Sequence, residues 1–291
     1  MKRINWIKLA VINLLLIVVI ISPFLPGPPN KLVIGLSVFG QSAGFFGLLL
    51  MPIGIIWAIV EIRNLRNRNN ENPSWRSAYS LAIIATAIIT AIYLLLVVGV
   101  FVNVELLAGS LALVLGAFAL KRAITEIKKL RDTSVRQLNP VPFYLLTIPL
   151  IAFITRIYLM EPFSDYSRSV AIERGQILIA AIEEYKNKEG QYPESIQDLE
   201  TRYLKKIPSP FIMGILNFQY NKINDHYSLS FSQWLELSSL EEIVLYDKNN
   251  LKNNLTGEFA KYDYSFDLCR VKGAFANHDT RHDHWRYYLV D

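Results

Sequence analysis

Long, nearly uncharged apolar stretches alternate with short polar connections over the first 160 residues, and no such stretch follows Glu161. A transmembrane helix needs about 20 mostly apolar residues to cross about 30 Å of hydrocarbon. The pattern predicts five membrane-spanning helices, at residues 9–25, 32–62, 79–102, 106–120 and 143–160. Residues 1–160 are therefore expected to form a transmembrane helical bundle, and residues 161–291 a separate domain.

The pattern of residues 161–291 begins as helical. Val170, Ile177, Ala181 and Tyr185 recur on one face of a helix, with polar residues on the other side. Pro162 is expected to separate this amphipathic helix from the fifth span, because proline removes a backbone donor and crowds the preceding turn. The new helix is expected to begin at residue 164 or 165 and to end at a glycine, residue 190.

The pattern then becomes extended. A capping-box spacing at residues 195–198 predicts a short helix to about residue 203. Alternating apolar and polar positions predict a hairpin between residues 216 and 231, with further strands at 242–246, 262–266 and 285–290. The expected fold class is an α-helical transmembrane bundle followed by an α+β domain, in which a long helix packs on an antiparallel sheet.

Positive charge is concentrated in alternate connections, and the other two connections carry one basic residue between them. Lysine and arginine cluster before the first predicted span, between the second and third, and between the fourth and fifth. The positive-inside rule places these connections in the cytoplasm. The chain is therefore expected to be a multi-pass protein of the cytoplasmic (inner) membrane, with its N-terminus inside and residues 161–291 outside. The lipid bilayer is its first expected partner.

The net charge of +5 divides unevenly, into +10 for residues 1–160 and −5 for residues 161–291. The basic half consists of membrane connections, so nucleic acid is not an expected partner. The predicted spans hold almost no ionisable side chains, which favours an anchoring bundle over a transport pathway. Five glycines in the second predicted span provide a small-residue surface for close helix packing: Gly35, Gly40, Gly44, Gly47 and Gly54.

One part of the second half resembles a known family. The resemblance rests on the runs at residues 180–185, 190–193, 196–199 and 207–208, which read AAIEEY, GQYP, IQDL and IP. Together they resemble the globular domain of type IV pilin-like proteins, most of all the major pseudopilin of type II secretion, between Val170 and Phe231. The resemblance implies a long helix on a small antiparallel sheet, with the Gly-x-Tyr-Pro corner after the helix. Four predicted spans and Pro162 precede the comparable helix, so assembly into a fibre is not expected.

The densest group of ligand-type side chains lies near the C-terminus. His278, His282, Asp283 and His284 fall within seven residues, and such side chains at close spacing can hold Zn²⁺ or another divalent ion. The alternative is a polar loop before the last strand. The family resemblance also implies Ca²⁺ near this end, with Asp263, Asp267, Asp279 and Asp283 as available oxygens, although no ligand pattern matches residue by residue.

The sequence thus predicts a membrane protein that presents a pilin-like domain for binding an envelope protein or the cell envelope, in connection with a secretion or pilus-type system. No catalytic or cofactor-binding residue is predicted, and Cys269 as the single cysteine excludes an intrachain disulfide. Two alternatives stay open. One is a membrane transport or processing component, and the other is a metal-dependent envelope enzyme that uses the cluster at residues 278–284. The sequence leaves the oligomeric state open.

Overall fold

The computed structural model describes residues 6–66, 141–223, 225–235, 241–246, 248 and 274–290, with isolated helical positions between 110 and 125. The predicted span at 79–102 and the predicted strand at 262–266 lie outside the described residues. So do Asp263, Asp267 and Cys269. Of the predicted span at 106–120, only Ser110, Val114, Ala117 and Phe118 are described, and all four are helical.

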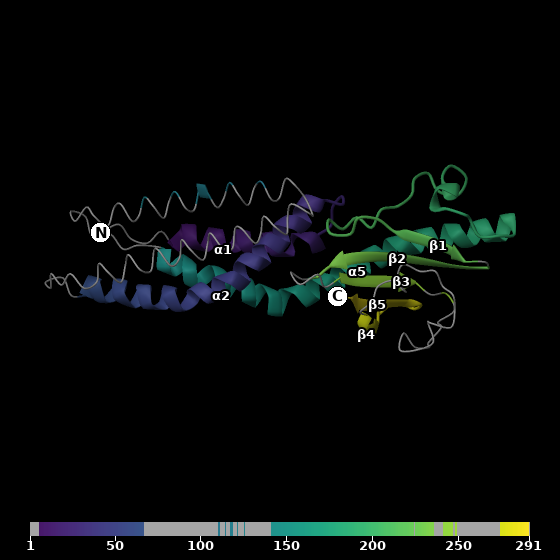
Figure 1. Ribbon diagram of the computed structural model, residues 1–291. Coiled ribbons are helices and arrows are strands. Elements are labelled where there is room, and N and C mark those ends of the chain that lie inside the picture. The colour runs from purple at the N-terminus through teal and green to yellow at the C-terminus, as the bar shows by residue number, and fades with distance from the viewer. Residues whose placement is uncertain are drawn as a thin grey trace. The chain divides into compact units, whose positions relative to one another are not determined.

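Three helices of the described chain are long and apolar enough to cross a membrane, judged by length and composition (Figure 1). They are α1 (Trp6–Ile21), α2 (Lys31–Arg66) and α5 (Val141–Glu189). They overlap the first, second and fifth predicted spans, and α5 continues 29 residues beyond the fifth.

Helix α5 is continuous over 49 residues, where the sequence predicted two helices separated at Pro162. That prediction is wrong. A proline inside a helix leaves one carbonyl without its backbone donor and costs about 3 kcal/mol. The turns that follow Pro162 are fixed to the sheet by side chains of residues 164–168, and this tertiary packing offsets the local preference for a break.

The chain divides into two compact units. One, the helical unit, comprises residues 1–21 and 35–159, and the other, the C-terminal domain, comprises residues 22–34 and 160–291. The connection between α1 and α2 therefore packs with the C-terminal half of the chain, although the sequence assigned it to the membrane bundle.

Glycines bring the helices of the helical unit together, as the small-residue pattern of α2 predicted. A Cβ on Gly44 would overlap the Cβ of Ala152, and one on Gly47 would lie 2.5 Å from Pro149 Cγ. These pairs place α2 against α5. Nearer the start of α2 and on the same helix face, a Cβ on Gly40 would lie 3.2 Å from Ile20 of α1.

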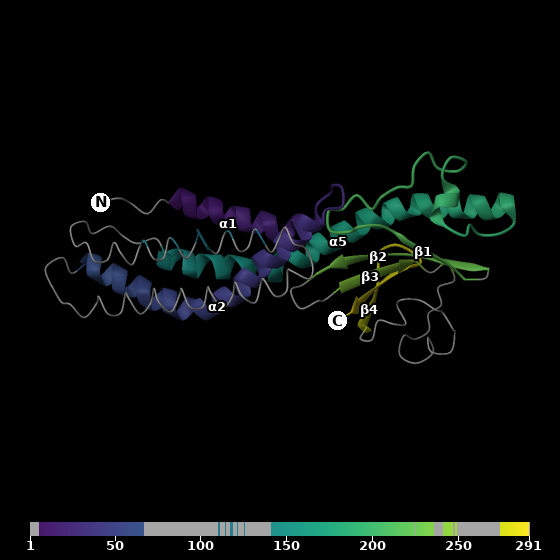
Figure 2. The same cartoon turned by 45° about the horizontal axis from the view of Figure 1, so that its top comes forward.

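The C-terminal domain holds a five-stranded antiparallel sheet in the order β1-β2-β3-β5-β4 (Figures 1 and 2). Its strands are β1 (Gln219–Ile223), β2 (His226–Trp234), β3 (Glu241–Tyr246), β4 (Ala274–Asp279) and β5 (Trp285–Val290). The predicted hairpin and the predicted strands at 242–246 and 285–290 are confirmed. Strand β4 was not predicted.

The second half of α5 packs along one face of this sheet. The helix contributes Leu178 and Ile182, both 0% exposed, and the sheet contributes Phe231 at 0% and Trp285 at 2%. A Cβ on Gly175 would lie 3.1 Å from the Trp285 ring, so this glycine admits the indole. The burial of these large side chains drives the helix onto the sheet.

Two details of the predicted helix change. Ile177 was assigned to its buried stripe, but it is 49% exposed, because the stripe is centred on Ala171, Gly175, Leu178 and Ile182. Gly190 ends the helix as predicted, with φ of +79° and its N–H donating to Lys186 O at 3.0 Å. This left-handed conformation favours glycine.

The short helix predicted to run to residue 203 is a single 3₁₀ turn, Ile196–Leu199. The Ser195 backbone N–H donates to Asp198 Oδ2 at 2.8 Å, so the capping interaction is present. The chain then turns at Thr201, whose φ is +77°.

Candidate functional site

A buried polar cluster joins α5 to the sheet, and we call it the polar junction. Its members are the side chains of Ser164, Ser167, Arg168, Gln233 and Glu242. The Arg168 guanidinium binds the Glu242 carboxylate twice, with Nε–Oε1 at 2.6 Å and Nη2–Oε2 at 2.7 Å. Arg168 is 8% exposed and Glu242 is 1% exposed. Two-point pairing of this kind is strong and directional.

The other members complete the hydrogen bonding. Gln233 Nε2 donates to Ser164 Oγ at 2.9 Å and to Glu242 Oε1 at 3.0 Å. Ser167 Oγ donates to Gln233 Oε1 at 2.7 Å. Each polar side-chain atom of these five residues therefore has a protein partner, and a fully satisfied buried network specifies one packing of helix on sheet. The polar junction acts as a positioning device, with no free group for catalysis.

The charge on Arg168 is held by its surroundings. Burial by itself would lower the pKa of Arg168, but its hydrogen bonds and charge pairing with Glu242 and Asp165 raise that pKa above its ordinary value. The Tyr287 ring of β5 lies 3.7 Å from the guanidinium carbon, which adds a cation–π contact. Arg168 thus ties α5 to β3 and β5.

Sequence reasoning did not find the polar junction. Arg168 and Glu242 are 74 residues apart, so no local motif connects them. One signal was present, because Arg168 lies seven residues before Gly175 and so falls on the apolar stripe of the helix. A charged residue on a buried helix face indicates a buried partner.

The connection between α1 and α2, residues 22–30, docks on residues 211–214, and we call it the docked connection. Gly27 N donates to Phe211 O at 3.0 Å, and Met213 N donates to Leu25 O at 3.1 Å. Pro26 and Ile212 form an antiparallel bridge. The Phe24 ring is 2% exposed. Backbone hydrogen bonds and a buried aromatic ring therefore make this connection part of the C-terminal domain.

A second pair of bonds extends the docking. Gly214 N donates to Pro23 O at 2.7 Å, and Asn30 N donates to Met213 O at 2.9 Å. A Cβ on Gly214 would lie 2.7 Å from Pro23 O, so only glycine allows this approach without movement of the backbone. The proline-rich run at residues 23–29 favours an extended chain, which is the conformation that such docking requires.

A tyrosine cluster lies toward the end of α5. Tyr227 OH donates to Glu183 Oε1 at 3.0 Å, and Lys248 Nζ donates to Glu183 Oε2 at 2.8 Å. The Tyr192 ring packs 4.9 Å from that of Tyr227, so the tyrosine of the Gly-x-Tyr-Pro corner is a core residue. Burial raises the pKa of Tyr227, and the neighbouring Tyr246 and Glu183 raise it further.

The residues predicted to bind metal lie on β4 and in the turn between β4 and β5. His278 lies on β4, where its ring stacks 4.9 Å from that of Tyr287. His282 and Asp283 lie in the turn before β5. His284, with φ of +68°, presents its ring to Tyr246 at 6.0 Å. Across the described part of the chain, no group of three or more His, Cys, Asp or Glu side chains is placed to hold a metal ion.

Comparison with known proteins gives no match: no family model, no curated protein and no solved structure matches the chain. The resemblance of Val170–Phe231 to type IV pilin-like domains therefore stays a prediction.

Proposed function

We propose that this chain is a multi-pass protein of the cytoplasmic membrane that presents its C-terminal domain on the outer side as a binding domain for an envelope protein. The docked connection carries the proposal. Two segments that fold into one compact unit lie on the same side of a bilayer. One of these segments follows α1, and the other follows the apolar half of α5.

The charge pattern indicates on which side of the membrane the C-terminal domain lies. Lys2, Arg3 and Lys8 stand at the N-terminal end of α1, and the positive-inside rule places that end in the cytoplasm. A single crossing by α1 then brings the docked connection outside, and the C-terminal domain with it. This placement agrees with the loop charges of the whole chain, which favour five spans.

The continuity of α5 supports a pilin-like arrangement, in which one helix serves both as a span and as the spine of the domain. The attachment of the domain differs from that of a fibre subunit. Because the docked connection is built into the domain, α1 and α2 also tether it. Release into a fibre would require three helices to leave the membrane together, so a fixed binding domain fits better than a polymerising one.

The outward face of α5 offers a surface for a protein partner. Ile177 is 49% exposed there, with exposed Glu173 one turn before it and exposed Glu184 two turns after it. An apolar side chain between carboxylates suits a partner with an apolar knob and flanking basic residues. We propose this face, within residues 173–184, as the contact surface of a secretion or pilus-type assembly.

Cysteine labelling in intact cells tests the topology. In a Cys269→Ser background, Pro29→Cys and Asn187→Cys place thiols at exposed positions of the docked connection and of α5. Both are expected to react with a membrane-impermeant maleimide. Thr125→Cys, in a basic connection predicted to be cytoplasmic, is expected to react only after permeabilisation. Labelling of only one of the two outer thiols would overturn the shared side, and labelling of neither would overturn the orientation.

A photo-crosslinking residue at position 177 tests the binding role. We expect a discrete adduct with one protein in living cells, and loss of that adduct when Glu173→Lys and Glu184→Lys reverse the surrounding charge. The same residue at position 45 of α2, where Phe45 is 62% exposed, is the matched control and is expected to yield lipid adducts. An adduct at 177 that survives charge reversal would contradict the proposed surface.

A further inference from the structure

Trp234 is a large aromatic residue at the end of β2 that remains 41% exposed. Strand register places it beside Glu241 of β3, which in turn pairs with Val290 of β5. All three positions are the terminal residues of their strands. Trp234 therefore lies at one end of the sheet, and the orientation of the domain decides what that end meets.

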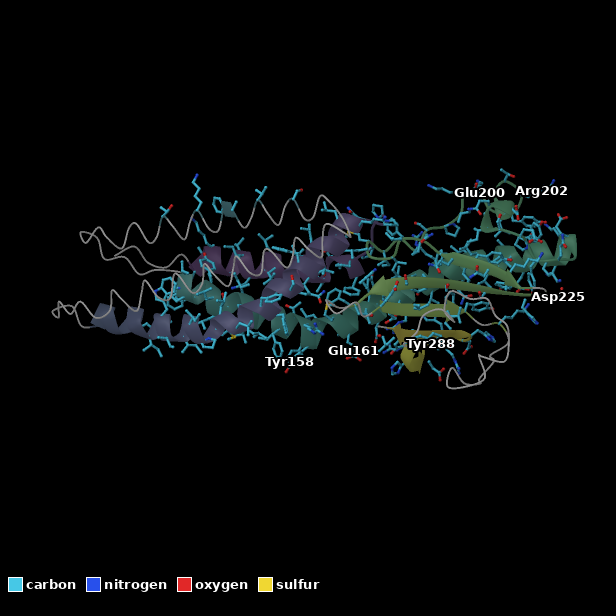
Figure 3. The ribbon with its side chains drawn as sticks, in the orientation of Figure 1. Tyr158, Glu161, Glu200, Arg202, Asp225 and Tyr288 are labelled. Atoms are coloured by element: carbon cyan, nitrogen blue, oxygen red, sulfur yellow. The ribbon has the colours of Figure 1, made fainter. Side chains whose placement is uncertain are left out.

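This end of the sheet lies beside the first turns that α5 contributes to the C-terminal domain. Figure 3 shows Glu161 at one end of the domain and Asp225, in the β1–β2 turn, at the other. Strand β2 begins beside Asp225 and runs back toward Glu161. Its penultimate residue, Gln233, is hydrogen bonded to the side chains of Ser164 and Ser167. Trp234 thus lies level with the turn of α5 that follows Glu161.

The distance along α5 sets the depth. The apolar run of α5 ends at Met160, and Ser164 is four residues further, which is about 6 Å along a helix axis. Beyond about 30 Å of hydrocarbon, the headgroup region adds about 5–8 Å on each side of a bilayer. A side chain level with Ser164 is therefore at headgroup depth if the apolar half of α5 fills the hydrocarbon.

We propose that Trp234 is an interfacial anchor that holds this end of the sheet against the lipid headgroups. The proposal rests on the membrane placement proposed above. Tyr166, in the same turn of α5 as Ser164 and Ser167, is 48% exposed and forms a second anchor at the same depth. Tryptophan and tyrosine concentrate at this depth because an apolar ring enters the acyl boundary while the N–H or O–H stays hydrated.

Trp234 and Tyr166 are proposed to bind the headgroup surface of the bilayer, whereas the spans contact its acyl chains. The sheet alternation turns Gln233 toward α5 and Trp234 away from it, whereas Tyr166 lies on α5 itself. Two anchors from different elements would hold the domain at a fixed tilt beside the membrane, and this tilt would set how the outward face of α5 meets a partner.

Depth-resolved fluorescence quenching of the full chain in phosphatidylcholine nanodiscs tests the proposal. The lipids carry bromine either near the headgroup or deep in the acyl chain, and acrylamide probes exposure to water. The Trp234 component is obtained as the difference between wild type and Trp234→Phe, which keeps a ring in place. We expect this component to be quenched by shallow bromine more than by deep bromine, and to be partly shielded from acrylamide.

Two further differences make the result decisive. Trp285→Phe isolates a core indole that is 2% exposed, and that component is expected to respond to neither bromine nor acrylamide. Trp6→Phe isolates a ring at the start of α1, and its component is expected to be quenched by bromolipid. If bromolipid quenched the Trp6 component, whereas the Trp234 component was quenched by acrylamide and not by bromolipid, the anchor proposal would be overturned. The proposed membrane placement would stand. Absence of bromine quenching from both would overturn the membrane placement as well.

Discussion

The two halves of α5 are held by different chemistry. The first half meets α2 through small residues, with Gly44 against Ala152 and Gly47 against Pro149. The second half meets the sheet through large apolar side chains such as Leu178 and through the polar junction. One helix thus passes from a contact made by close backbone approach to a contact made by side-chain burial.

The proposed surroundings of each half account for the difference. In lipid, burial of apolar surface gives no driving force between helices, so association depends on close packing that small residues permit. In water, burial of apolar surface drives packing, and any charge carried inward needs a complete set of partners. The comparison makes separate predictions for each half, because the first half is sensitive to added volume and the second to a removed partner.

The largest expected effect is at the polar junction. Arg168→Met leaves the Glu242 carboxylate buried without its cation, and loss of one partner from a buried pair costs about 3–5 kcal/mol. We expect the free energy of unfolding of the C-terminal domain, measured by denaturation in detergent, to fall by about that amount. The double variant Arg168→Met/Glu242→Leu is expected to lose less than the single one, since it leaves no buried charge. A double variant worse than Arg168→Met would contradict this account.

The next effect is at the contact between α2 and α5. Gly44→Leu inserts a side chain where even a Cβ would overlap Ala152, and overpacking costs about 1–3 kcal/mol or more. We expect a lower thermal midpoint of the helical unit in detergent. Phe45→Leu places the same residue one position along, at a side chain that is 62% exposed, and is expected to have little effect. Equal losses from both substitutions would contradict a specific small-residue contact.

The spacing of apolar residues along the chain predicted those helices and strands in which buried positions recur at a regular interval. Strand β2 occurs where Tyr227, Leu229 and Phe231 alternate with serines, a pattern typical of a sheet with one face covered. Strand β5 occurs where it was predicted, and β3 begins one residue earlier. Strand β4, Ala274–Asp279, was not predicted, since it lacks a comparable alternation. It is a strand through its pairing with β5, for example His278 with Tyr287.

The remaining features depend on residues far apart in the sequence. Helix α5 continues through Pro162 although proline usually breaks a helix. The turns that follow are held by a long-range contact, the ion pair of Arg168 with Glu242. The docked connection needs a glycine at position 214, whose N–H donates to Pro23 O, and this contact spans about two thirds of the chain. The polar junction had one local signal, an arginine on an apolar stripe, but its partners on β2 and β3 had none. Such contacts are properties of the fold, so patterns of period 2 or 3.6 do not contain them.

A pH-dependent effect is expected from the tyrosine cluster of the C-terminal domain. The pKa of Tyr227 is raised above its ordinary value of 10.0, so the folded chain keeps a proton that the unfolded chain loses. The stability from this group is fully present below pH 10 and falls as the pH rises further. Tyr227→Phe is expected to lower stability at pH 8 by about 1 kcal/mol, through the lost bond to Glu183, and to make the alkaline decline shallower. Denaturation at several pH values checks both, and an unchanged alkaline slope would rule out Tyr227 as its source.

The smallest expected effect distinguishes two hydroxyl groups of the helical unit. Ser37 Oγ donates to Ile20 O at 2.6 Å and accepts from Gln41, whereas Thr155 Oγ1 is buried and has no hydrogen-bond partner among the described residues. Ser37→Ala removes a bond between helices and is expected to cost about 0.6 kcal/mol. Thr155→Val keeps the shape and removes an unsatisfied hydroxyl, so it is expected to be neutral or to stabilise by up to about 1 kcal/mol. Thermal midpoints in detergent give the two signs. If Thr155→Val lowered the thermal midpoint as much as Ser37→Ala does, a water molecule or another polar group would have to bind the Thr155 hydroxyl. Hydrogen bonding, as well as close packing, would then hold the first half of α5 in place.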